Sequence, residues 1–256
     1  MTPSSGIVNG LDGHTRLYWE ARGRGAPVLL VHGLGLSGGA WWRTVDALAP
    51  RMRVITFDHR GIGRSESWTY AYTTEAMADD AVSILDDLAI ERVHLYGFSL
   101  GGMVAQQIAL RHPARVRSLV LGATHSGGRR AAAPDPEVVA FIRRRGTVPS
   151  EEAAWASVPY NYGARSRTEH VDRIAEDIER RLRSPFNERA YRAQLLGSPR
   201  ADRCPHADRP RRARSDDPGG QRPYDRRARA RRAVEDPQGR RSPVSDRGAR
   251  CGRGHR

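Results

Sequence analysis

Residues 93–102 read Val-His-Leu-Tyr-Gly-Phe-Ser-Leu-Gly-Gly, and this stretch decides the fold. Its first four residues are typical of a buried strand, and a helical pattern runs from Gly101 to about Arg111 before Pro113 stops it. Ser99 therefore lies on a tight strand-to-helix turn, where flanking glycines avoid the clash that a Cβ would cause. The free N–H groups of a helix N-terminus favour developing negative charge, so we interpret Ser99 as a catalytic nucleophile rather than part of a plain structural turn.

The surrounding sequence alternates apolar runs with amphipathic segments. Further strands are predicted at residues 28–31, 54–57 and 116–121, because each is a short run of mainly apolar residues. A helix is predicted from about Glu75 to Leu88, with Thr74 able to cap its start. Strands that alternate with helices predict an α/β fold built on a mostly parallel sheet.

A second motif, His-Gly-Leu-Gly at residues 32–35, directly follows the first of these strands. Acyl transfer needs two N–H donors aimed at the oxyanion, and the backbone N–H groups of Leu34 and Leu100 are the natural pair. His32 precedes the nucleophile and lies beside the oxyanion site. We therefore interpret His32 as a residue that fixes the loop, not as the general base.

The third motif is Asp-His-Arg-Gly-Ile-Gly-Arg-Ser at residues 58–65. We interpret it as a sharp loop fixed by Asp and Arg hydrogen bonds, so Asp58 is not expected to be the catalytic acid. With these motifs and the segment Arg-His-Pro-Ala-Arg-Val-Arg-Ser-Leu-Val-Leu at 111–121, the chain resembles the α/β-hydrolase superfamily, in its esterase, lactonase and haloperoxidase-like branch, over residues 7–196. The resemblance implies a Ser–His–Asp triad, with the acid after a late strand and the His in a terminal turn. Neither partner stands where that pattern requires it.

The chain is expected to have three parts. Residues 1–126 form the α/β-hydrolase core, and residues 127–196 form a helical lid because helical periodicity replaces strand-like runs there. The remaining part, 197–256, is an Arg-rich tail. Aromatic residues of core and lid are candidates to line a mostly apolar substrate pocket, although lid aromatics more often serve simple packing; the candidates are Trp41, Phe98, Trp155 and Tyr160.

The tail differs from the rest in composition. The chain carries a formal net charge of +14, all 43 basic residues are Arg, and residues 200–256 hold 18 Arg against 8 Asp and Glu. This segment contains no Ile, Leu, Met, Phe or Trp, so it cannot bury enough apolar area to offset its chain entropy and is predicted to be disordered. The two cysteines, Cys204 and Cys251, both lie here and support neither a disulfide framework nor a metal cluster.

A parallel sheet of this family still needs two strands and a closing helix after the lid. We hypothesise a single-nucleotide shift of the reading frame near Gly197, real or from sequencing, in preference to a functional tail. Reading the possible codons one nucleotide to the right permits a strand and turn at 206–214, a helix at 221–226, and a strand ending in Gly-Ala-Gly-His-Leu-Phe at 234–244. The degenerate code leaves part of that choice free, and the catalytic acid stays unassigned.

The sequence predicts a serine hydrolase of a small ester, lactone or related acyl substrate, impaired in this chain by loss of the catalytic His. His206 and His255, in the tail, are not expected to hold the required geometry. Two alternatives stay open: haloperoxidase or C–C bond hydrolase chemistry on the same fold, and an inactive binding protein whose tail grips polyanions. A small molecule is the expected partner, with no cofactor, metal, specific nucleic acid or membrane, and without a targeting segment the expected location is the cytoplasm.

Overall fold

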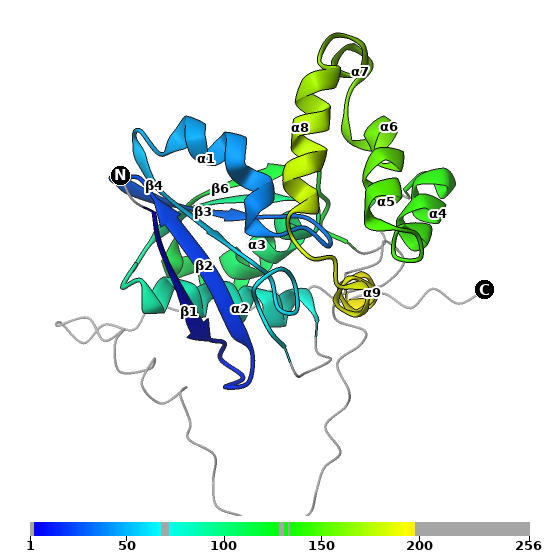
Figure 1. Cartoon of the computed structure of the whole chain (residues 1–256). Coiled ribbons are helices and arrows are strands. Elements are labelled where there is room, and N and C mark those ends of the chain that lie inside the picture. Colours follow the sequence, from blue (N-terminus) through cyan, green and yellow to red (C-terminus); the bar gives the residue numbers. More distant parts are fainter. Residues whose placement is uncertain (1–2, 68–71, 128–130, 133, 198–256) are drawn as a thin grey trace, which may run out of the picture. The chain divides into compact units, whose positions relative to one another are not determined.

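A six-stranded sheet forms the centre of the protein in the computed structural model, which describes residues 3–67, 72–127, 131–132 and 134–197 (Figure 1). The chain divides into two units, Met1–Arg209 and Pro210–Arg256, and every described residue belongs to the first. The strand order is β1-β2-β4-β3-β5-β6. The strands are β1 (Ser4–Asn9), β2 (Arg16–Arg22), β3 (Ala26–Val31), β4 (Met52–Phe57), β5 (Val93–Phe98) and β6 (Val116–Gly122).

The pairing from β4 through β3 and β5 to β6 is parallel, whereas β1 pairs with β2, and β2 with β4, in antiparallel fashion. The predicted mostly parallel sheet is therefore confirmed, and each of the four predicted strands lies inside an observed one. The antiparallel β1–β2 hairpin was not predicted. Its signal was the alternation in β2, where Leu17, Trp19 and Ala21 are buried and the residues between them are not.

Helices cover both faces of the sheet (Figure 1). The larger core cluster joins the sheet to α2 (Thr74–Asp87) and α3 (Leu100–Arg111), and a smaller one joins β3 and β4 to α1 (Trp42–Leu48). The prediction that Thr74 caps α2 was wrong by one residue. The residue that caps this helix is Thr73, whose hydroxyl accepts a 3.1 Å hydrogen bond from the Ala76 N–H, because Thr74 already has helical geometry. Two short 3-10 helices, η1 (Gly38–Trp41) and η2 (Pro113–Arg115), complete this part.

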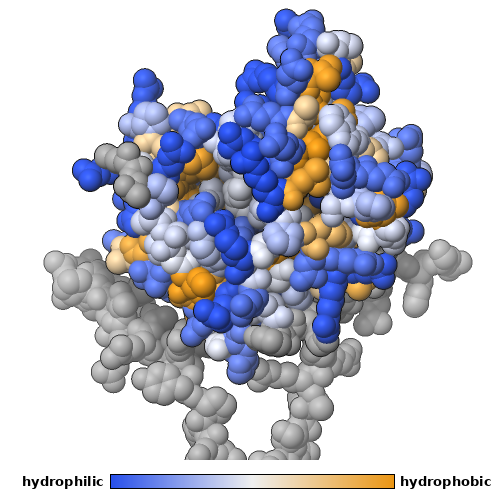
Figure 2. All heavy atoms as spheres, viewed as in Figure 1, coloured by the Kyte–Doolittle hydropathy of each residue, from blue (hydrophilic) through white to orange (hydrophobic). Residues whose placement is uncertain are grey.

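All the regular elements among the described residues of the segment predicted as a lid are helices. In Figure 2 apolar side chains form a band along α8, with hydrophilic ones on either side. Ile174 and Ile178 of this helix pack against Ala154 of α5, as the periodicity predicted. No described helix is both long and apolar enough to cross a bilayer. The helices are α4 (Pro136–Arg145), α5 (Ser150–Ala156), α6 (Val158–Asn161), α7 (Ala164–Glu169), α8 (Val171–Leu182) and α9 (Glu188–Gly197).

The Arg-rich tail beyond Gly197 lies outside the described residues. The predictions of disorder and of a shifted reading frame therefore stay predictions. The same holds for any role of His206, His255, Cys204 and Cys251.

Candidate active site

Ser99 stands between the end of β5 and the start of α3, as predicted. Its backbone has φ 53° and ψ −121°, a left-handed conformation that is costly for a residue with a side chain. Two hydrogen bonds fix this turn. The Ser99 N–H donates to the Gly122 carbonyl at 2.9 Å, and the Thr124 hydroxyl donates to the Ser99 carbonyl at 2.7 Å. The end of β6 thus holds the serine in its strained geometry.

Glycines make this turn possible because backbone and side-chain atoms crowd it closely. A Cβ on Gly97 would lie 2.5 Å from the Gly101 carbonyl oxygen, and a Cβ on Gly101 would lie 2.1 Å from the Val31 carbonyl oxygen. A Cβ on Gly33 would lie 3.3 Å from the Cβ of Ser99. The loop that follows β3 is therefore in contact with the serine turn, which brings the first two sequence motifs together.

The two predicted oxyanion donors belong to this junction. Leu100 is the first residue of α3, so its N–H lies at the positive end of the helix dipole. Leu34 directly follows Gly33 in the loop against Ser99. Within the described residues neither N–H donates a hydrogen bond. Two unengaged donors beside a serine are what an oxyanion site requires, and the assignment itself stays a prediction.

His32 is buried and engaged with backbone carbonyls. Its Nε2 lies 2.9 Å from the Phe57 oxygen and its Nδ1 lies 3.2 Å from the Gly33 oxygen. Burial lowers the pKa of His32, against the opposing effect of the Asp58 carboxylate, and burial also lowers the pKa of the adjacent His59 well below its ordinary value. Both ring nitrogens thus face backbone carbonyls of the adjoining loops, and the interpretation of His32 as a loop-fixing residue stays a prediction.

The 58–65 loop is fixed by Asp58, as expected. Oδ1 of Asp58 accepts from the Gly38 N–H at 2.7 Å, and its Oδ2 accepts from the Arg64 N–H at 2.9 Å. Arg60 turns the other way and forms two 2.7 Å hydrogen bonds with Asp80 of α2. Both carboxylates are occupied with holding the loop, so neither is placed as the catalytic acid.

In the described part of the chain, no His or carboxylate is hydrogen-bonded to the Ser99 hydroxyl. No described group of His, Cys, Asp or Glu side chains is arranged to hold a metal ion. Among the described residues, Ser99 and the N–H groups of Leu34 and Leu100 thus remain the predicted nucleophile and oxyanion donors, and no general base is placed beside them.

The four aromatic candidates separate into two pairs. Trp41 lies next to the serine turn, with its ring centroid 6.5 Å from that of Phe98 and 5.0 Å from that of Tyr96. Trp155 and Tyr160 lie in the lid. The Tyr160 ring stacks on Phe141 at 4.7 Å, and Trp155 is 45% exposed. The substrate role of all four stays a prediction.

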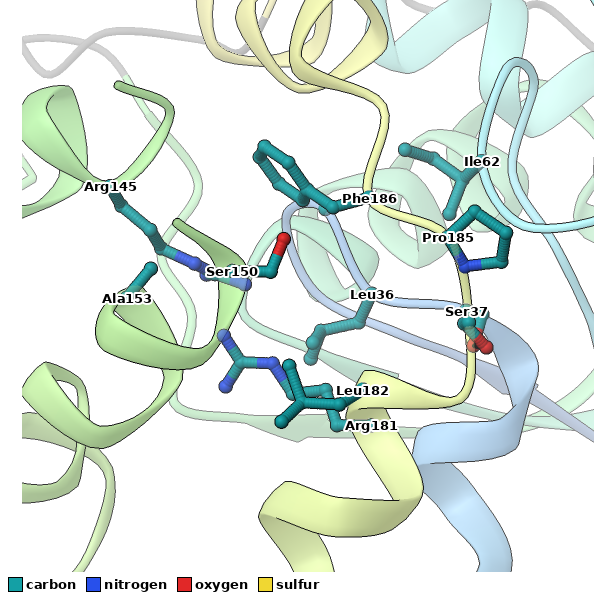
Figure 3. A pocket seen from close by; sticks show the side chains of 12 residues that line it. Leu36, Ser37, Ile62, Arg145, Ser150, Ala153, Arg181, Leu182, Pro185 and Phe186 are labelled. Atoms are coloured by element: carbon teal, nitrogen blue, oxygen red, sulfur yellow. Dashed lines mark hydrogen bonds between the residues drawn. The ribbon is translucent and has the colours of Figure 1, made fainter. Parts of the chain in front are cut away.

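A pocket that the sequence did not predict lies between the β3 loop and the lid (Figure 3). Its cavity is about 30 Å³, and it is lined by residues 35–37, the ends of α4 and α8, the start of α5 and residues 184–186. Ser99 does not line it. Arg145 and Arg181 both extend toward it, and the signal for them was the run of arginines at the ends of two predicted helices.

Comparison with known proteins agrees with this geometry. A family model described as "alpha/beta hydrolase fold" matches residues 26–187. A protein of Azorhizobium caulinodans named "Putative carbamate hydrolase RutD" is 39% identical over 109 residues, which cover 43% of this chain and 41% of that protein. The pimeloyl-[acyl-carrier protein] methyl ester esterase of Vibrio campbellii is 31% identical over 190 residues, covering 73% of this chain and 60% of the esterase.

Among solved structures, Est816, described as an N-acyl homoserine lactone degrading enzyme, is 29% identical with a TM-score of 0.59. That match covers 73% of this chain and 70% of Est816. The chain thus spans less than two thirds of the length of the curated relatives described above. The residues that match the family model, 26–187, include β3 to β6, the turn at Ser99 and α4 to α8.

Proposed function

Because the chain belongs to the alpha/beta hydrolase fold family, we propose that it is a serine hydrolase of a small ester, lactone or related acyl substrate, with Ser99 as the nucleophile. The observation that carries this proposal is the left-handed backbone of Ser99 at the start of α3, in contact with the Gly33 loop. A strained turn persists only where the surrounding structure holds it, and such strain concentrates at functional sites.

The chemistry follows from these positions. The Ser99 Oγ attacks the acyl carbon, and the carbonyl oxygen becomes an anion that the N–H groups of Leu34 and Leu100 stabilise. The C–O bond to the alcohol then breaks, leaving an acyl ester on Ser99, and water hydrolyses that ester to release the acid. The ester and lactone activities for which two relatives are named support this class of substrate.

Attack by Ser99 also requires a base that accepts the proton of its hydroxyl. Since no described His is hydrogen-bonded to Ser99, we expect turnover by this chain to be lower than that of a complete triad by a factor of about 10⁶, the loss seen when the His of a triad is removed. A nucleophile without its base still reacts slowly with a strong electrophile, which makes covalent labelling the appropriate test.

The test is labelling of the full chain with a fluorophosphonate probe, followed by peptide mapping. We expect slow, stoichiometric modification at Ser99 and its complete loss in Ser99→Ala. Ser118→Ala is the matched control, because the Ser118 hydroxyl lies 2.8 Å from His94 Nδ1 but sits on a strand without strained geometry or a helix start. Labelling that disappears with Ser118→Ala, or that persists unchanged in Ser99→Ala, would refute the proposal.

A further inference from the structure

Arg145 and Arg181 place two positive charges in the pocket between the β3 loop and the lid. Figure 3 shows the two side chains, one from the end of α4 and one from the end of α8, extending toward the same space beside Leu36. Both side chains are partly buried. The remaining lining is apolar or hydroxyl-bearing and contains no Asp or Glu.

Neither arginine has an acidic partner among the described residues. Their hydrogen bonds are long: Arg145 Nη1 donates to the Leu34 carbonyl at 3.5 Å, and Arg181 Nη1 donates to the Ser157 hydroxyl at 3.4 Å. By contrast, the partly buried Arg43 is paired with Glu176 and Asp177. The described lining of the pocket therefore contains no negative charge that compensates the two arginines. Withdrawing a guanidinium from water without a carboxylate beside it costs free energy.

The lowered pKa values of Arg145 and Arg181 also indicate that their charges are not compensated. Burial and, after it, the positive charge of Arg145 together lower the pKa of Arg181 to about 10. Burial also lowers the pKa of Arg145. Both groups still carry their charge at neutral pH, so two like charges share one small space and an anion between them would relieve their repulsion.

We propose that this pocket binds the carboxylate of an anionic substrate, so that the substrate is an ester carrying a free carboxylate at its far end. This assignment rests on the proposed hydrolase function. A planar guanidinium fits a carboxylate through paired N–H donors. The cavity of about 30 Å³ admits one small group, and the apolar side chains of Leu36, Leu182 and Phe186 suit a short methylene chain.

The place of the pocket agrees with the proposal of a carboxylate site, because the pocket and the serine turn contact the same loop after β3. Arg145 contacts the carbonyl of Leu34, whose N–H is the proposed oxyanion donor, and Gly33 in the same loop contacts Ser99. A carboxylate held by the arginines would therefore anchor the substrate on the loop that also faces its reacting carbonyl.

The experiment compares binding of monomethyl glutarate and dimethyl glutarate to the full chain by titration calorimetry at constant ionic strength. Monomethyl glutarate is expected to bind at least ~10-fold more tightly, because a hydrogen bond to a charged group contributes about 1.5–3 kcal/mol. Arg145→Met and Arg181→Met are each expected to weaken that binding by about 10-fold or more. Arg143→Met removes an exposed arginine of the same helix and serves as the matched control.

Thermal melting shows whether the variants fold. Since Met removes a partly buried charge that has no acidic partner, the ligand-free variants should melt at or above the wild-type temperature, and monomethyl glutarate should stabilise only the wild type and Arg143→Met. Equal binding of both esters, equal loss in Arg143→Met, or equally tight binding of inorganic phosphate would overturn the carboxylate assignment. Fluorophosphonate labelling of Ser99 is a separate readout, so failure of the hydrolase proposal is distinguishable from failure of this one.

Discussion

At the scale of single residues, the serine turn depends on glycine at three positions, because a Cβ there would crowd neighbouring atoms. Gly97, Gly101 and Gly33 leave room where a Cβ would meet a neighbouring carbonyl oxygen or the Cβ of Ser99 itself. The strain of Ser99 is tolerated because Gly122 and Thr124 hold its N–H and carbonyl. The geometry of the proposed nucleophile is therefore set by steric fit around one residue rather than by a partner of its hydroxyl.

Gly101→Ala is expected to destabilise the protein by more than about 3 kcal/mol, the upper part of the range for overpacking. The Cβ would stand 2.1 Å from the Val31 oxygen and 2.5 Å from the His32 oxygen, and both are backbone atoms that cannot move aside. The sign of the change in the free energy of unfolding is informative, because Gly→Ala inside a helix normally stabilises a protein by about 1 kcal/mol. Urea unfolding measures the change. Gly163→Ala, where a Cβ meets nothing within 4 Å but the residue is the N-cap of α7, should cost no more than about 1 kcal/mol, and equal effects would contradict this account.

At the scale of elements, a buried ion pair ties the loop after β4 to α2. Arg60 is 3% exposed and Asp80 is 1% exposed, and two 2.7 Å hydrogen bonds join them. Burial raises the pKa of Asp80, while Arg60 opposes that rise. Asp12, in the turn between β1 and β2, lies 3.5 Å from Arg60, so one guanidinium connects three segments that are distant in sequence.

Arg60→Ala is expected to cost about 3–5 kcal/mol, because it leaves the Asp80 carboxylate buried and unpaired. The measurement is urea unfolding at pH 7. Arg165→Ala breaks an exposed pair with Glu169 on one helix and should cost less than about 0.5 kcal/mol. A small loss in Arg60→Ala would mean that water or another group satisfies Asp80, and the connecting role would be wrong.

At the scale of the whole molecule, the sheet ends on an apolar strand. Among the described residues β6 pairs with β5 alone, and its Val120 and Leu121 are 55% and 44% exposed. Native edge strands are usually covered, twisted or charged, since an apolar edge invites aggregation. An edge of this kind is what the family's fold would leave if the strands that follow the lid were not encoded in frame.

We therefore expect a chain with the reading frame restored after about residue 197 to place a strand beside β6. The amides of residues 119–121 should then exchange with deuterium more slowly than in the present chain, because a new strand removes them from water. Ester turnover should appear together with this protection, since the shifted frame permits a His in the terminal turn. Sequencing the gene is the first step. A stop codon in the shifted frame, or restored chains without added protection of β6, would eliminate the frame hypothesis.

Local chemistry let the sequence determine much of this protein. Apolar runs, glycine spacing and helical periodicity predicted four strands, α2, α3, the helical lid and the position of Ser99, because each depends on neighbours along the chain. Tertiary structure alone decided the antiparallel hairpin, the contact between Gly33 and Ser99, and the pair of Arg145 and Arg181 in one pocket. These join residues far apart in sequence, and no local pattern records which distant charges end up side by side without a counter-ion.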